Sequence, residues 1–572
     1  MFWYDEFPAR LQFELDELEN AGFSVVIDPE RRAAGQLVLT VVYRIAEAEH
    51  PLMVVFPSDY PYFAFQVFAP TLALAKHQDP VSKLLCFVAH IDSEWNMAAD
   101  TVAKYLLEQL PEVLKADKGD PSVAEAREGA PITGFLNYMT DSLVVTSDWA
   151  LPPENGRGKL VIGVENDVDL NKLFRCAILE VHDINGDVLG QSDLSIQARY
   201  PGRFHARWVR LTGPPKSTEP LRVLDEAIKI WPELLKPNFN GEPDVVGLVF
   251  ADQARFEEQH DIWLFLVRRR FRASVPVKTG RRLPPGDQIQ YFLARADRGS
   301  RDDLQTRVPR LKPAAEKVVS VFGLGALGST VAWQLARAGI GRLNLIDHDF
   351  VQAGNIPRWI MGWAAAGYGK ADVLAKHITH NYPFVETLAI PLKVGSPMDV
   401  KSPVGDYESR MARALEGTDL IIDCTVEFTV QNFLADYAWK HGIPYLWGTG
   451  TPGAWGGIVG RAIRGKTLGC WRCFRHQLFE KKIDAPVFEE GPTVQPIGCF
   501  SPTFTGSGFD MDSVALQTVR MAVATLCVGA EHGYPDFDWD VGVVNLWKDG
   551  HPIAPSWQTC PLDQHPACDA HG

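Results

Sequence analysis

The sequence predicts a multidomain protein that combines α/β and α+β units. Its 572 residues are enough for three or four domains. A glycine-rich turn joins an apolar strand at 318–322 to a helix, which is typical of a parallel α/β unit. A helix and four closely spaced apolar runs open the chain, which indicates an antiparallel meander. We expect domains over residues 1–118, 119–311 and 312–572.

Composition narrows the classes of partner. The net charge of −15 argues against nucleic acid or an anionic membrane as the main partner. No apolar run reaches the roughly 18 residues of a membrane-spanning helix, and the N-terminus lacks the basic start of a signal peptide. Nine cysteines fit a reducing compartment. We expect a cytoplasmic protein in which some thiols are reactive or bind metal.

The glycine turn has the spacing of a nucleotide site. Gly323, Gly325 and Gly328 would let the backbone approach a phosphate at a helix N-terminus. Asp347 ends the next strand, 19 residues after Gly328 (347 − 328), where an acid can hold a ribose hydroxyl. Both NAD and ATP fit these residues.

Three polar residues downstream favour ATP. Asn355, Arg358 and Lys370 supply a cluster of donors and cations, and transfer at a phosphate depends on positioning and charge neutralisation. A dehydrogenase needs no such cluster. From about residue 312 to near the C-terminus, the pattern resembles the Rossmann-like ThiF/MoeB adenylation fold of ubiquitin-activating enzymes.

That resemblance implies ATP, magnesium and a face-to-face homodimer. The family's magnesium aspartate falls on Val426, so Glu427 or Asp423 substitutes for it or the metal is held differently. Residues 299–313 are expected to tether this domain. Arg307 or Arg310 in the tether is expected to reach the partner's ATP site, as an N-terminal arginine does in the family.

Two groups of cysteines follow. Cys499 lies in a loop rich in glycine and proline before a helix expected at about 510–526, whose N-terminus favours a thiolate. The resemblance implies that Cys499 forms a thioester, against the alternative of a loop cysteine without a chemical role. It also implies a structural zinc on Cys470, Cys473, Cys560 and Cys568, although the second pair has seven intervening residues, and His565 offers another ligand. The alternative is a vestigial site with free thiols.

The N-terminal segment resembles a ubiquitin-conjugating enzyme over residues 1–118. The resemblance rests on an order of elements: a helix bearing Leu11, Leu15 and Leu18, four strands, Tyr60-Pro61, a loop, Leu85-Cys86, Trp95 and a helix near 98–110. It implies that Cys86 forms a thioester rather than serving as a buried apolar residue. The family's His-Pro-Asn is absent, and Gln78 and Asp79 are possible substitutes for an oxyanion donor and an amine-orienting acid.

The middle region carries no catalytic pattern. Its predicted strands alternate with loops rich in proline and glycine, and a short helix follows Trp231. The arginines at 268–270 and 272 are expected to be a solvated strand end rather than an anion site. We expect a structural linker domain.

Together these parts resemble the CD-NTase-associated ubiquitin-transferase-like proteins of bacterial type II CBASS anti-phage operons. The resemblance implies that ATP adenylates the C-terminus of a cGAS-like nucleotidyltransferase, that Cys499 and then Cys86 carry it, and that a target lysine receives it. Two alternatives remain open: a MoeB-type sulfur-carrier adenylyltransferase with an N-terminal docking domain, and a scaffold with a decayed site. A third, an NAD oxidoreductase, is disfavoured by Arg358 and Lys370.

Overall fold

A computed structural model of the chain describes residues 2–571 apart from 46–47, 75–76, 79–81, 88–94, 121, 123–141, 146–148, 150, 166–175, 216, 218, 240–242, 256–257, 273–286, 397–405, 492 and 495–502. It divides into two compact units, Met1–Ser300 and Arg301–Gly572. In the described part, no helix is long and apolar enough to cross a bilayer.

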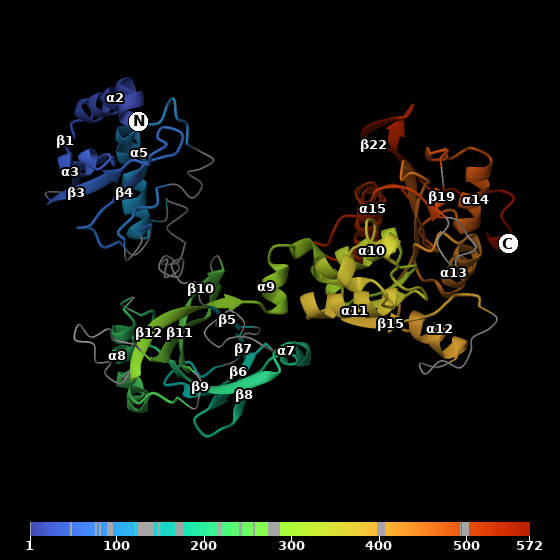
Figure 1. Ribbon diagram of the computed structural model, residues 1–572, viewed down its shortest axis with the longest axis horizontal. Helices are drawn as coiled ribbons and strands as arrows, with labels where there is room; N and C mark the ends of the chain where they lie inside the picture. Colours follow the sequence, from blue (N-terminus) through green and yellow to red (C-terminus); the bar gives the residue numbers. More distant parts are fainter. Residues whose placement is uncertain are drawn as a thin grey trace, which may run out of the picture. The chain divides into compact units, whose positions relative to one another are not determined.

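The first unit begins with helices around an antiparallel sheet in the order β1-β2-β3-β4 (Figure 1). The elements are α1 (Trp3–Glu6), α2 (Pro8–Asn20), β1 (Ser24–Ile27), α3 (Pro29–Ala33), β2 (Val38–Ile45), β3 (Ala48–Val55), β4 (Gln66–Phe68) and α5 (Val102–Asp117). The expected order of helix, meander and helix is therefore present. The last helix starts four residues later than expected because Thr101 caps it, its Oγ1 accepting from the Lys104 N–H.

A buried carboxylate ties α2 to α5. Glu14 is fully buried, and its Oε2 accepts the Val102 N–H at 2.9 Å. Its Oε1 binds Arg10 at 2.6 Å and also accepts the Tyr60 hydroxyl. These bonds offset the cost of burying a charge. Glu14 therefore holds α2 against the N-terminus of α5.

The rest of this unit is an eight-stranded sheet in the order β5-β12-β11-β10-β9-β6-β7-β8. A bridge between Val144 and Ala177 also joins β5 to β7, so seven strands close into a ring. Core side chains fill one face, and α8 packs on the other face. The elements are β5 (Ser142–Val145), β6 (Arg157–Val164), β7 (Cys176–Asp183), β8 (Val188–Gln191), α7 (Leu194–Arg199), β9 (Gly202–Arg210), α8 (Pro220–Ile230), η3 (Pro232–Leu235), β10 (Asp244–Arg255), β11 (Glu258–Arg272) and β12 (Asp287–Arg298).

One expectation for this region is wrong. Arg268 is not at a solvated strand end but is 1 % exposed within β11. Its Nε donates to Asp244 Oδ2 at 2.5 Å, and its Nη1 donates to the Leu234 carbonyl at 2.7 Å. A buried guanidinium needs such partners, so the arginine joins β11 to β10 and η3 on the face of the sheet that α8 covers.

The second unit is a doubly wound α/β domain. Its sheet order is β15-β14-β13-β16-β17-β18-β21-β22, with the first five strands parallel. Helices α10, α11 and α15 bury one face, and α12, α13 and α14 bury the other (Figure 1). The strands are β13 (Val318–Phe322), β14 (Arg342–Ile346), β15 (Glu386–Ile390), β16 (Leu420–Asp423), β17 (Tyr445–Gly450), β18 (Gly456–Ala462), β19 (Thr493–Val494), β20 (Thr503–Phe504), β21 (Val541–Lys548) and β22 (His551–Cys560). The helices are α9 (Arg301–Gln305), η4 (Pro309–Glu316), α10 (Ala326–Arg337), η5 (Ala353–Asn355), η6 (Trp363–Ala365), α11 (Lys370–Asn381), α12 (Tyr407–Leu415), α13 (Phe428–His441), α14 (Trp471–Phe479), α15 (Gly508–Leu526) and η7 (Asp569–His571).

The chain order creates a switch point in this sheet. From β13 the chain moves outward through β14 and β15, and then returns to the other side of β13 as β16. In open parallel sheets ligands bind beyond the carboxyl ends of the strands at such a reversal. The expected tether is part of this unit, since Arg301 donates to the Ala315 and Phe384 carbonyls.

Candidate adenylation site and thiol centres

The glycine turn follows β13 at the switch point. Gly323 has φ +80°, and a Cβ there would lie 2.7 Å from the Thr425 backbone. A Cβ on Gly328 would lie 1.8 Å from the Gly323 carbonyl, so only glycine lets α10 start this close to the strand. A Cβ on Gly325 would meet nothing within 4 Å, which leaves the turn open where the helix begins. The N-terminus of α10 therefore faces open space suited to an anion.

Two backbone N–H groups hold the Asp347 carboxylate against the glycine turn. Its Oδ2 accepts the Leu324 N–H at 2.7 Å, and its Oδ1 accepts the Asp349 N–H at 2.8 Å. The Leu324 carbonyl in turn accepts the Trp359 indole N–H at 2.7 Å. Leu324 thus links the acid after β14 to the segment that carries Arg358, a link that the sequence did not reveal.

Lys370 opens α11 and points back toward the same edge. Its Nζ lies 3.0 Å from Asp349 Oδ2, and only 11 % of its side chain is exposed. Burial raises the pKa of Asp349, but the charge of Lys370 outweighs this effect and holds that pKa below its ordinary value. Asp349 is therefore ionised at neutral pH and forms an ion pair with Lys370.

Asn355 and Arg358 lie on the intervening segment. Asn355 Oδ1 accepts the Gln352 N–H at 3.0 Å and closes a capping box on η5. Burial lowers the pKa of Arg358, although a guanidinium remains charged at neutral pH. A Cβ on Gly508 would lie 3.4 Å from Arg358 Cα, so the start of α15 packs against this segment.

The loop after β16 holds the candidates for a magnesium ligand. Asp423 is fully buried: Oδ1 accepts from the N–H and the hydroxyl of Thr425, and Oδ2 accepts from Tyr445. Burial raises the pKa of Asp423 to about 6. Glu427 is exposed at the N-cap of α13, and its side chain makes no capping bond. Between the two, Glu427 is the carboxylate that can reach a solvated cation.

Val426 itself has an unusual backbone. Its φ is +61°, and its side chain is 49 % exposed. Aspartate and asparagine tolerate this left-handed region, whereas a β-branched residue rarely adopts it. The backbone therefore keeps a conformation suited to an aspartate at the position where one was expected.

Cys86 lies at the end of the long N-terminal loop and is exposed. Its N–H donates to the His77 carbonyl at 2.9 Å. Gln78 is 2 % exposed: its Nε2 donates to the Ala69 carbonyl and its Oε1 accepts the Leu74 N–H, each at 2.9 Å. The Gln78 amide therefore secures the loop that presents Cys86. Asp79 lies outside the described residues.

Cys499 also lies outside the described residues, so the structure does not place it. The helix that follows is present as α15, which begins at Gly508 with Ser507 as its N-cap. Among the tether arginines, Arg307 and Arg310 are both exposed, and the Arg310 carbonyl accepts from the Cys527 thiol at 3.8 Å.

Three of the four predicted zinc ligands come together. Cys470 Sγ lies 3.9 Å from Cys473 Sγ and 3.6 Å from Cys568 Sγ. In the described structure, Cys560 at the end of β22 is not part of this group. His565 is committed elsewhere, because Nδ1 accepts the Ala567 N–H and Nε2 lies 3.0 Å from Glu480. Three convergent thiols supply three of the four donors that a tetrahedral structural zinc requires.

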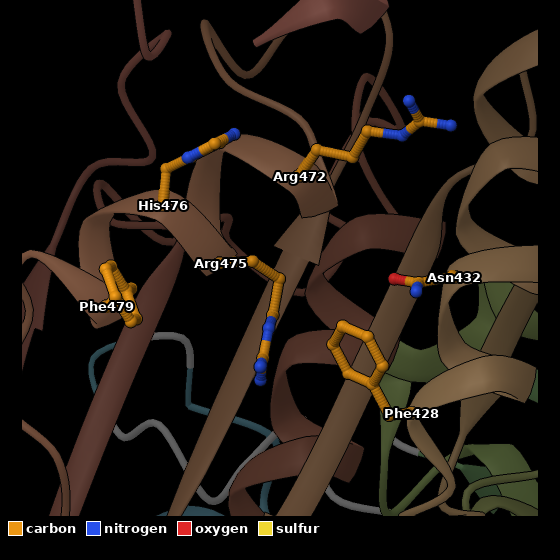
Figure 2. Close-up of a pocket in the computed structure, with 6 residues that line it drawn as sticks. All are labelled: Phe428, Asn432, Arg472, Arg475, His476 and Phe479. Atoms are coloured by element: carbon orange, nitrogen blue, oxygen red, sulfur yellow. The ribbon is translucent and has the colours of Figure 1, made fainter. Parts of the chain in front are cut away.

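A groove that sequence reasoning missed lies between α13 and α14 (Figure 2). Its volume is about 350 Å³, and its lining combines aromatic rings, an amide and cations: Phe428, Asn432, Arg472, Arg475, His476 and Phe479. The signal was present in the sequence, since the four residues from α14 have the spacing i, i+3, i+4 and i+7 of one helical face.

Comparison with known proteins assigns the second unit. Residues 305–528 match the sequence model of the ThiF family. They therefore form a ThiF/MoeB-type adenylation domain.

Among particular relatives, the uncharacterized protein y4oA of Sinorhizobium fredii is 28 % identical over 99 % of this chain and 97 % of its own length. The ATP-dependent ubiquitin transferase-like protein Cap2 of Enterobacter hormaechei is 30 % identical over 28 % of this chain and 26 % of its own. The adenylyltransferase and sulfurtransferase MOCS3 of Mus musculus is 30 % identical over 32 % of this chain and 38 % of its own length. The crystal structure of E. coli MccB with ATP matches 46 % of this chain and 69 % of that chain, at 16 % identity and a TM-score of 0.33.

Proposed function

We propose that this protein is an ATP-dependent enzyme that adenylates the C-terminal carboxylate of a protein substrate and conjugates it to an amine. The observation that carries the proposal is the convergence of the glycine turn, Asp347 and Lys370 at the switch point of a ThiF-type domain. The open N-terminus of α10 would receive phosphates there, and Asp347 would receive the ribose.

In the first step a substrate carboxylate oxygen attacks the α-phosphorus of ATP and pyrophosphate leaves. Lys370 and Arg358 neutralise charge that develops on the phosphates, and Asn355 adds a polar contact. A bound magnesium ion would hold and polarise the phosphate oxygens. Of the two candidate magnesium ligands, only one suits the ion. Glu427 is an exposed carboxylate at this edge, whereas Asp423 is buried and fully hydrogen-bonded.

Two thiolates then relay the acyl group. The Cys499 thiolate attacks the acyl carbon of the adenylate and AMP leaves; the Cys86 thiolate attacks this thioester and frees Cys499. A lysine amine of the target attacks the second thioester, loses a proton and releases Cys86 as an amide forms. The exposure of Cys86 and the order of elements around it support a ubiquitin-conjugating-like role for residues 1–118.

The proposed substrate is a cGAS-like nucleotidyltransferase that is primed for anti-phage defence. The match to an ATP-dependent ubiquitin transferase-like protein supports the transfer reaction, and the substrate itself follows from the resemblance to the CBASS-associated proteins. The enzyme would act in the cytoplasm as a homodimer, with Arg307 or Arg310 completing the partner's ATP site. The three-domain division at 118 and 311 is part of the same proposal.

A second candidate is a sulfur-carrier adenylyltransferase of the MoeB type. The match to an adenylyltransferase and sulfurtransferase favours it. This reading needs the same adenylation site but no chemistry at Cys86, and residues 1–118 would then only dock the carrier protein.

Substrate-dependent ATP–pyrophosphate exchange tests the proposal. The full chain, Mg-ATP and a cGAS-like nucleotidyltransferase with its native C-terminus should exchange labelled pyrophosphate into ATP. The same nucleotidyltransferase with a C-terminal amide should not, because it lacks the attacking carboxylate. Equal exchange with both would reject the proposed reaction.

A further inference from the structure

The outward face of α14 differs sharply from its inward face. Trp471, Cys473 and Phe474 are buried against the domain core. The other face presents Arg472, Arg475, His476 and Phe479 to the groove, and Phe479 is 88 % exposed. Phe479 shares the groove with a second exposed ring, Phe428. Exposed apolar rings gathered beside cations are typical of a surface that binds a partner.

The opposite wall of the groove comes from α13. Phe428 is 49 % exposed, and Asn432 Oδ1 accepts the Trp471 indole N–H at 2.8 Å, which fixes the two helices together. Phe428 is also the first residue of α13, two positions after Val426. The groove therefore starts beside the loop at the carboxyl end of β16, where the candidate nucleotide site lies.

The two arginines of the groove have different environments. Arg472 is neutralised by Asp436 and Asp569. The Arg475 guanidinium lies 4.4 Å from the centre of the Phe428 ring, and within the described residues no carboxylate pairs with it. Figure 2 shows Arg475 reaching between Phe428 and Phe479. The groove thus offers one cation without an acidic partner, flanked by two apolar rings.

We propose that this groove binds a segment of the protein substrate in which a carboxylate lies next to an aliphatic or aromatic side chain. This inference rests on the proposed function and names the docking element of the substrate. The planar guanidinium of Arg475 would pair with the carboxylate. The apolar neighbour would cover Phe428 and Phe479, which a small anion or a nucleic-acid backbone would leave in water.

The groove's position explains its use. A C-terminal carboxylate must reach the α-phosphate while the rest of the substrate is held outside the site. A docking point that begins two residues from Val426 would anchor the preceding segment and direct the terminus toward the glycine turn. Binding at a distance from the reacting atoms is also how substrate binding energy is directed to positioning.

The test uses random dodecapeptides displayed on phage and the full-length protein without ATP. We expect selection on the wild type to enrich peptides with aspartate or glutamate within three positions of a large apolar residue. Synthetic copies should bind Arg475→Gln and Phe479→Ser at least about tenfold more weakly, since a central contact is worth more than about 1.4 kcal/mol. A peptide in which asparagine replaces the aspartate should bind the wild-type protein more weakly by a similar factor. The exposed Arg464, which does not line the groove, provides the matched control Arg464→Gln, which should bind like the wild type.

Three results would overturn the inference. One is a selection that enriches no peptide or a basic consensus. Another is equal binding to the wild type and to Arg475→Gln. The third is conversion of a dimer to a monomer by Phe479→Ser, which would assign the groove to a second copy of the chain. Lys370→Ala should still bind the peptides, so loss of pyrophosphate exchange and loss of docking are separate failures.

Discussion

Lys370 and Asp349 form an ion pair at the carboxyl edge of the sheet, with Nζ and Oδ2 3.0 Å apart. Their backbones are joined as well, because the Lys370 N–H donates to the Asp349 carbonyl at 2.9 Å. The pair positions the Lys370 side chain at the edge of the sheet where β13 and β14 end. A phosphate arriving there would meet a cation that is already positioned.

Lys370→Ala should therefore lower carboxylate-dependent ATP–pyrophosphate exchange by about 10²–10³-fold, the usual loss for one charge-stabilising group. Lys376→Ala is the matched control, because Lys376 is exposed on the same helix. It should retain the wild-type rate. Equal rates for both variants would remove Lys370 from the site.

Much of this edge could be predicted from the sequence because its residues act through local rules. Glycine at a tight approach and an acid at a strand end are constrained by their own backbone. The burial of Asp423 and Arg268 could not be predicted, because it depends on which distant strands and helices cover each strand. The separation of Cys568 from Cys560 likewise depends on where β22 ends, and the groove depends on how α13 packs on α14.

Asp423 should give the protein a pH-dependent stability. The pKa is about 6 in the folded protein and 3.8 for an ordinary aspartate, so the folded state binds this proton more tightly. This contribution to the free energy of unfolding is full below pH 3.8 and is lost as pH rises through about 6. The loss amounts to about 3 kcal/mol. Calorimetry at several pH values should show that Asp423→Asn removes this dependence, whereas Asp484→Asn at an exposed position should keep it.

Val426→Asp should relieve the backbone and add a ligand. Relief of the φ +61° strain should raise the stability by about 1 kcal/mol. The new carboxylate should also lower the magnesium concentration required for half-maximal pyrophosphate exchange. Val426→Gly separates the two effects, because glycine relieves the strain without supplying an oxygen. If both variants change the magnesium requirement equally, the position is not a metal ligand.

The geometry of the thiol cluster predicts which cysteine-to-serine variants still bind zinc. Cys568→Ser should lose bound zinc, because Cys568 Sγ is 3.6 Å from Cys470 Sγ. Cys560→Ser should keep it, since Cys560 is not in the described group of three. Elemental analysis of both purified variants measures this directly. Zinc loss in Cys560→Ser with retention in Cys568→Ser would reverse the assignment.

The two proposed thioester cysteines should act in series, and this order distinguishes the two candidate functions. Cys499 belongs to the compact unit that carries the glycine turn, whereas Cys86 belongs to the other unit. We therefore expect Cys499 to displace AMP in the first step and Cys86 to accept the acyl group in the second. With ATP and the protein substrate, Cys499→Ala should leave neither cysteine charged. Cys86→Ala should accumulate a reducible adduct on Cys499 and form no amide.

Both variants should retain ATP–pyrophosphate exchange, because neither thiol takes part in adenylation. Non-reducing gels of the reaction, run beside samples treated with reductant, separate thioesters from amides. Cys176→Ala is the matched control, because Cys176 is a buried core residue of β7 and should leave every adduct unchanged. If Cys86→Ala still yields a conjugate that resists reductant, residues 1–118 do not transfer the acyl group. The sulfur-carrier function would then account for both the adenylation site and the thiol cluster without a second transfer step.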